Sequence, residues 1–129
     1  MKRWTVLGFS ALWVASMVFL PVVGGWAAEK GGKTVTITGE VIDVACFFAK
    51  GAKGSGHEKC AKMCIEGGVP AGLLADDGKI YILAGDMMEN PEAFQKAKEY
   101  AAKRVSVTGT VIEKDGAKLL LVQSVQPAR

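Results

Sequence analysis

Apolar and polar residues alternate along several short stretches of the chain, which is the two-residue period of a β-strand. These stretches are rich in β-branched residues, and two of them are interrupted by Asp-Gly, a dipeptide that accepts the positive φ angles of a tight hairpin. The pattern therefore predicts five strands, which lie in residues 34–47, on either side of Asp77-Gly78 in residues 71–85, and on either side of Asp115-Gly116 in residues 104–125.

Residues 90–103 follow a helical period instead. Asn90 stands at the N-cap position, Pro91 at the first helical position and Glu92 in the first turn, which together are typical of a helix start. The residues that share its apolar face are Ala93, Phe94, Ala97, Tyr100 and Ala101.

The resulting order is strand, insert, strand, strand, helix, strand, strand, with Gly39 and Gly109 in the middle of strands. A mid-strand glycine is typical of a bulge or sharp bend that lets a small sheet close. This order, with "VTGTVIEKDGAKLLLVQSV" as closing hairpin, resembles the small exported OB-fold proteins of bacteria. Over residues 34–126 the resemblance implies a mainly β fold, a five-stranded OB-type barrel with a helix between strands 3 and 4. It implies no particular ligand.

The first 27 residues predict a signal peptide. A basic start and a long apolar run end in small residues, and we expect cleavage after Ala27. An uncleaved membrane anchor is the alternative, because the apolar run is long enough to span a bilayer. We expect residues 28–33 to form a flexible lead to an exported, periplasmic or secreted domain. Without the leader the net charge falls from +3 to about +1, which argues against nucleic acid as a partner.

The insert between strands 1 and 2, residues 46–68, holds all three cysteines and the only histidine. Ser55 and Glu58 fit a capping box, so a helix is predicted from about Gly56 to Gly67. His57, Cys60 and Cys64 fall on one face of that helix, and Cys46 lies at the end of the first strand. Cys46, His57, Cys60 and Cys64 are therefore predicted to converge as a tetrahedral Cys₃His set suited to zinc or copper(I).

A disulfide from Cys46 to Cys60 or Cys64 is the alternative interpretation. It would tie the insert to the barrel and leave one free thiol. The function would then be recognition of an exported protein or small ligand without metal. The metal-binding interpretation is favoured because the cysteine count is odd and the helical face is shared.

The sequence favours a binding module over an enzyme. It contains no C-x-x-C redox pair, no haem attachment site and no phosphate-binding glycine loop, so neither haem nor a nucleotide is expected. Asp43 is expected at the surface. The sequence also predicts that Phe47 and Phe48 pack the insert onto the barrel, and that Met63, Met87 and Met88 fill the core rather than bind copper.

Overall fold

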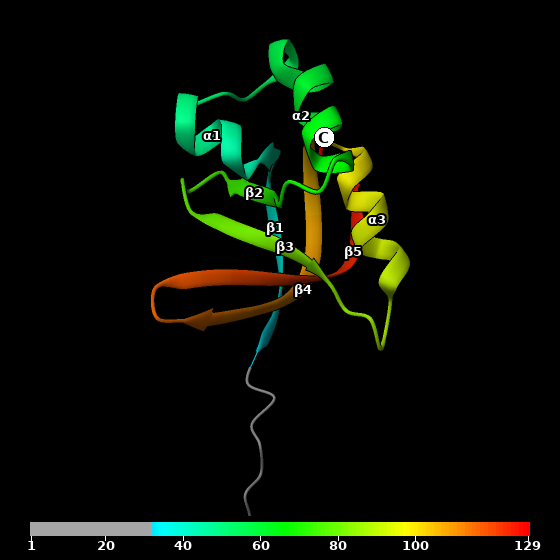
Figure 1. The fold of residues 1–129 in the computed structure, drawn as a ribbon. Coiled ribbons are helices and arrows are strands. Elements are labelled where there is room, and N and C mark those ends of the chain that lie inside the picture. Colours follow the sequence, from blue (N-terminus) through cyan, green and yellow to red (C-terminus); the bar gives the residue numbers. More distant parts are fainter. Residues whose placement is uncertain (1–31) are drawn as a thin grey trace, which may run out of the picture.

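The chain from residue 32 to residue 129, which the computed structural model describes, forms a closed five-stranded barrel with three α-helices (Figure 1). The predicted signal peptide and most of the predicted lead lie outside the described residues, although Lys33 already belongs to the first strand. In chain order the elements are β1 (Lys33–Asp43), α1 (Val44–Lys50), a 3₁₀ turn η1 (Ser55–His57), α2 (Glu58–Glu66), β2 (Ala71–Ala75), β3 (Ile80–Gly85), α3 (Pro91–Glu99), β4 (Arg104–Lys114) and β5 (Ala117–Pro127).

The strands are hydrogen-bonded in the order β1-β2-β3-β5-β4, and β1 pairs with β4 to close the barrel. The β3–β5 pair is parallel and the other pairs are antiparallel. α3 lies between β3 and β4 in the chain, and α1, η1 and α2 form the insert between β1 and β2. The predicted fold class is confirmed, and this barrel is compatible with an OB-like fold.

Both mid-strand glycines allow close approach between strands. A Cβ atom on Gly39 would lie 2.2 Å from the Leu74 carbonyl oxygen, at the point where β1 pairs with both β2 and β4. A Cβ atom on Gly109 would lie 2.1 Å from the Leu121 carbonyl oxygen, and the β4–β5 register shifts between Thr108 and Gly109. Only glycine fits such contacts, and the predicted bulge is confirmed at Gly109.

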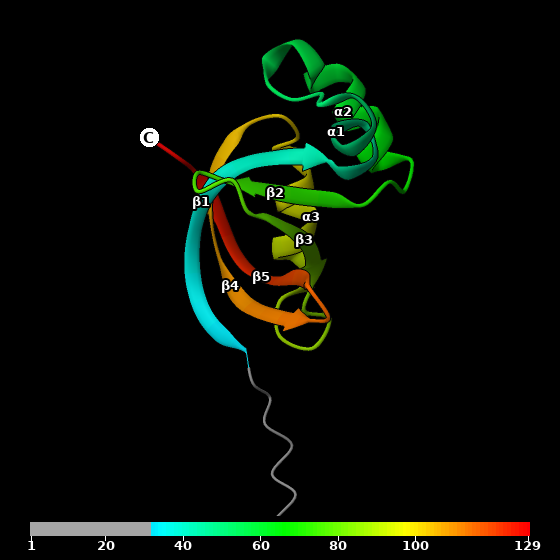
Figure 2. The same cartoon turned by 90° about the vertical axis from the view of Figure 1, so that its left-hand side faces the viewer.

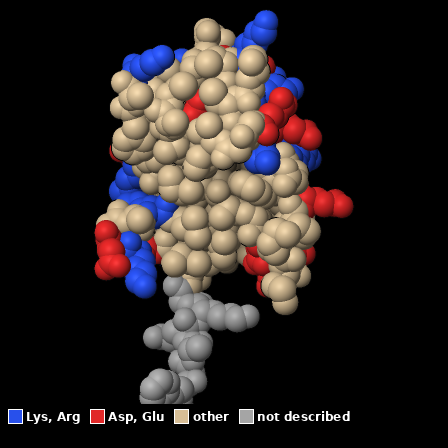
Figure 3. Space-filling view, viewed as in Figure 1, with Lys and Arg blue, Asp and Glu red and all other residues tan. Residues whose placement is uncertain are grey.

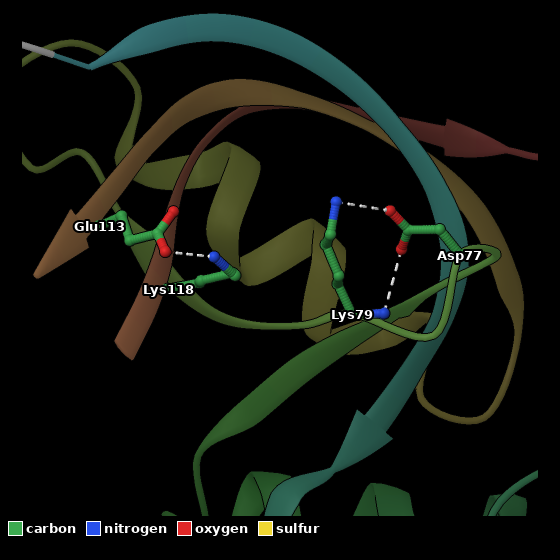
Figure 4. Close-up of polar contacts among 4 residues, drawn as sticks. All are labelled: Asp77, Lys79, Glu113 and Lys118. Carbon is green, nitrogen blue, oxygen red and sulfur yellow. Dashed lines mark hydrogen bonds and ion pairs between the residues drawn. The ribbon is translucent and has the colours of Figure 1, made fainter. Parts of the chain in front are cut away.

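Both predicted hairpins form at their Asp-Gly dipeptides. Figure 4 shows the Asp77–Lys79 and Glu113–Lys118 contacts of the two hairpins. Gly78 has a φ of 84°, and the Lys79 backbone N–H donates to Asp77 Oδ1 at 3.0 Å. In the β4–β5 hairpin, Asp115 and Gly116 both have positive φ, as a primed turn requires. Further along this hairpin, Lys118 Nζ lies 2.5 Å from Glu113 Oε1.

α3 begins as predicted. The Asn90 side chain accepts a hydrogen bond from the Ala93 backbone N–H at 3.2 Å, and Pro91 is the first helical residue. The helix packs against β3 and β5 with Ala93 and Ala97 buried, and Ala97 is fully buried in the core. The barrel interior beneath it is filled by Val41, Leu73, Leu83, Val105, Val107, Leu120 and Val122.

The first strand is shorter than predicted. β1 ends at Asp43, and the next seven residues form α1 rather than the end of a strand reaching Phe47. The Asp43 side chain caps this helix by accepting from the Cys46 backbone N–H, and Gly51 ends it at a φ of 66°. A helix cap at Asp43 therefore outweighs the strand propensity of the residues that follow it.

Four residues expected to pack inside are exposed. Met63, Met87 and Met88 are at least 63% exposed, so the prediction that they fill the core is wrong. Phe48 is 69% exposed, and its ring contacts the Phe47 ring edge to face. The buried core residues of α2 are instead Ala61 and Ile65.

Candidate metal centre

The insert stands at one end of the barrel, where β1 ends and β2 begins. Figures 1 and 2 both show α1 and α2 beside each other at this end. The Val44 N–H donates to the Pro70 carbonyl oxygen at 3.1 Å, and Asp43 is paired with Ala71 in the β1–β2 ladder. These contacts bring the two ends of the insert together, so residues shortly after Asp43 meet residues shortly before Ala71.

Asp43 and Cys46 are positioned by the start of α1. The Cys46 backbone N–H donates to Asp43 Oδ1 at 3.1 Å, which places the Cys46 side chain in the first turn of the helix. Asp43 is completely buried, contrary to the expectation that it lies at the surface. A carboxylate with no exposure is costly unless something compensates its charge.

α2 positions the other two cysteines. Ala61 and Ile65 are buried on the core side of this helix, and they are one helical turn apart. Cys60 and Cys64 directly precede these two anchors, so their side chains lie beside the buried face of α2. Cys64 is half-buried and Cys60 is exposed.

His57 lies in η1, immediately before α2, and not inside the helix as predicted. The predicted capping box is also absent: no side chain caps η1 or α2, and the Glu58 backbone N–H bonds to the Ser55 carbonyl oxygen instead. In the 3₁₀ turn, a backbone carbonyl oxygen accepts the hydrogen bond that the Ser55 side chain would accept in a capping box.

The structure arranges the ligand-type residues in two sets that share Cys46. The ligand atoms of Cys46, His57 and Cys60 all lie within 4.8 Å of one another, and so do those of Asp43, Cys46 and Cys64. Cys46, His57, Cys60 and Cys64 are thus brought to one cluster, but His57 and Cys64 fall in different sets. They are seven positions apart in the chain, which corresponds to about 10 Å of rise along a helix. A single meeting point of all four residues therefore stays a prediction.

Two buried polar atoms have no hydrogen-bond partner among the described residues: Asp43 Oδ2 and His57 Nε2. Each belongs to one of the two sets. Buried polar atoms are nearly always paired, so an unpaired one marks a place that a ligand or ion can complete. Both atoms belong to residues of the same cluster.

The carboxylate and the thiols influence one another. Burial acts to raise the pKa of Asp43, but the Cys46 N–H and the thiols of Cys46 and Cys64 outweigh it, so the pKa is lowered from 3.8. Contact with this carboxylate raises the pKa of the Cys46 thiol, and raises the pKa of Cys64 to about 12. The thiols are close enough for this effect, although neither completes a hydrogen bond to Oδ2. At neutral pH and without metal, Cys46 and Cys64 are therefore protonated beside an ionised Asp43.

All three cysteines are free thiols in the structure. The alternative interpretation, a disulfide from Cys46 to Cys60 or Cys64, is not supported. Cys46 lies within 4.8 Å of both partners, so the sulfur atoms are neighbours without being bonded.

Sequence reasoning missed Asp43 as a member of the cluster. Its signal was present: an aspartate three residues before Cys46 fits an N-cap whose carboxylate faces the first turn of a helix. Because the residues around it alternate like a strand, the helix and its cap were overlooked.

Comparisons with known proteins gave no match to a family model, to a curated protein or to a solved structure. The similarity to small exported OB-fold proteins of bacteria therefore stays a prediction, whereas the barrel itself is observed. Within residues 32–129, every helix is too short or too polar to cross a membrane.

Proposed function

We propose that this protein is an exported metal-binding module in which the Cys/His/Asp cluster of the insert holds a transition metal. The observation that carries the proposal is the pair of unpartnered buried atoms, Asp43 Oδ2 and His57 Nε2, in a cluster with three free thiols. A metal ion would supply the missing partner of both atoms and the positive charge that the buried carboxylate lacks.

Zinc fits the ligands better than copper(I). The set of Cys46, His57 and Cys60 suits either ion, because both accept thiolate and imidazole ligands. The set of Asp43, Cys46 and Cys64 adds a carboxylate, a hard ligand that zinc accepts and that a soft copper(I) ion disfavours. We therefore name zinc as the metal, with copper(I) as the competing occupant of the first set.

Export strengthens the case for a bound metal. Three thiols close to one another would be expected to oxidise in the periplasm or outside the cell. Metal ligation converts the three thiols to bound thiolates and protects them from disulfide exchange. The export itself is proposed from the leader sequence, whose residues lie outside the described structure.

Storage or transfer fits the cluster better than a purely structural role. Closed structural zinc sites surround the ion with four protein ligands, whereas the exposed thiol of Cys60 gives an incoming ligand access to the centre. The barrel core is also built from apolar contacts that include none of the ligand residues. The domain is therefore expected to fold without metal and to exchange it.

The proposal is tested by elemental analysis and a thiol count on protein purified from the native compartment without reductant. We expect bound zinc, and three thiols that become reactive only after chelation. Protein without metal that carries one free thiol and one disulfide would contradict the proposal, and would restore the interpretation of a disulfide-stabilised binding protein.

A further inference from the structure

The cluster divides into two halves, each suited to one metal ion. Two atoms bound to the same zinc at 2.0–2.3 Å are about 3.5 Å apart in tetrahedral geometry, and at most about 4.6 Å apart. Each set of three ligand atoms lies within 4.8 Å, so a small contraction suffices for each to close on an ion. A single ion would have to draw together His57 and Cys64, whose separation α2 and η1 fix.

We propose that the cluster binds two Zn²⁺ ions bridged by the Cys46 thiolate, one held with His57 and Cys60 and the other with Asp43 and Cys64. This inference rests on the metal-binding function proposed above and goes beyond it in number and connectivity. Cys46 is the only residue common to both sets. A thiolate sulfur has more than one lone pair and is polarisable, so it can serve two soft or borderline cations at once.

Charge balance favours two ions over one. When the three thiols have lost their protons, the cluster carries four negative charges, from Asp43, Cys46, Cys60 and Cys64, while His57 binds as a neutral imidazole. Two Zn²⁺ ions supply four positive charges and leave the centre neutral. One ion would bind two thiolates and leave the third thiol protonated, so the centre would keep one net negative charge around a carboxylate that is fully buried.

No salt bridge in residues 32–129 balances the negative charge of Asp43. On the face shown in Figure 3, lysines and arginines are mixed with acidic residues around the edge, and a small acidic area in the upper centre is surrounded by uncharged residues. No ion pair in residues 32–129 involves Asp43, because the four salt bridges there lie at other residues. Without metal, the Asp43 carboxylate is therefore stabilised by the Cys46 N–H and the neighbouring thiols, and not by a cation.

Each ion would have three protein ligands and one position for an outside ligand. This is the coordination of zinc sites that exchange a ligand, whereas structural sites are closed by four. The exposed side chain of Cys60 places one of these positions near solvent. The two ions are therefore unequal, and the ion held with His57 and Cys60 is expected to leave first.

The experiment is a titration of the reduced full-length protein with Zn²⁺ against a chromophoric chelator, together with ¹¹³Cd NMR of the cadmium-loaded protein. We expect two zinc ions per chain, and two cadmium resonances that are scalar-coupled through the shared sulfur. Asp43→Asn, which keeps a side-chain acceptor for the α1 cap, and Cys60→Ser should each bind one ion. Cys46→Ser should lose both, and the exposed Met63→Leu should keep two.

The outcomes separate this inference from the function on which it rests. One ion in the unaltered protein and one in Asp43→Asn would overturn the two-ion cluster while leaving metal binding intact. Two uncoupled cadmium resonances would overturn the Cys46 bridge. Failure to bind either metal would overturn both proposals. The NMR measurement uses the unaltered protein, so a variant that failed to fold would not prevent a decision.

Discussion

Asp43 and Cys46 hold each other at the start of α1: the Cys46 backbone N–H donates to Asp43 Oδ1 at 3.1 Å, while Asp43 Oδ2 stays buried and unpaired. One oxygen of the carboxylate thus serves the fold and the other is free for a ligand. The same residue ends a strand, caps a helix and faces two thiols. The Asp43 side chain is therefore expected to contribute both to the stability of the insert and to metal binding.

The two roles of Asp43 can be separated by substitution. In metal-free protein, Asp43→Asn should be more stable than Asp43→Ala by about 1 kcal/mol, because asparagine still caps a helix and alanine does not. Zinc affinity should fall at least about tenfold in both variants, because a carboxylate that binds zinc, or that hydrogen-bonds to a zinc ligand, contributes at this level. Urea unfolding and zinc competition measure the two effects. Equal stability of the two variants would contradict the capping role.

Alkaline pH should destabilise the metal-free protein through Cys64. Its folded pKa of about 12 lies above the ordinary value of 9.0, so its contact with Asp43 stabilises the fold fully below about pH 9. This contribution is lost as the pH rises toward 12, when the folded thiol also ionises beside the carboxylate. Unfolding by urea in chelator and reductant at pH 8 and pH 10.5 should show a larger loss in the unaltered protein than in Cys64→Ser. An equal loss in both would contradict the prediction.

The anchor of α2 should control both stability and metal affinity. Ile65 is 2% exposed and joins the barrel core directly after Cys64. Ile65→Ala should lower the free energy of unfolding by about 2–4 kcal/mol because it leaves a cavity. It should also weaken zinc binding, since Cys60 and Cys64 then lose their fixed position. Met63→Ala on the exposed side of the same helix is the matched control and should change neither quantity.

Barrel closure should depend on Gly109. A methyl group there would meet the Leu121 carbonyl oxygen, so Gly109→Ala should cost about 3 kcal/mol or more in unfolding free energy. Gly56→Ala is the control, because a Cβ atom at Gly56 meets nothing within 4 Å. Thermal unfolding of the two variants measures the difference. Similar midpoints for both would mean that β4 and β5 tolerate a side chain at the bulge.

The leader should be removed on export. Mass spectrometry of the exported protein should find a mature amino terminus near Ala28, because the small residues that a signal peptidase requires end at Ala27. Intact leader in the membrane fraction would instead support an anchor. Replacing Ala27 with a bulky residue should slow processing, whereas the same change at Ala52 in the insert should not.

Local signals in the sequence determined where most of the helices, strands and turns lie. The Asp77-Gly78 and Asp115-Gly116 turns, the Asn90 cap and the mid-strand glycines act within a few residues of themselves or through backbone space alone. Each of these signals depends on the conformation of its own short segment, so its effect can be predicted without knowledge of distant residues. The same reasoning found the cysteines and His57 as a cluster, because they lie within one short insert.

Tertiary structure decided which of these residues meet. The closing β1–β4 pair and the parallel β3–β5 pair join residues far apart in the chain, and no local pattern specifies either. The burial of Asp43 follows from the insert folding back over the end of β1, which converts an aspartate at a strand end into a buried cap beside two thiols. The separation of His57 from Cys64 follows from the rise of the helix between them. Sequence spacing shows which residues share a face of a helix. Which of them lie near Cys46 depends on where the rest of the chain places Cys46 along that helix.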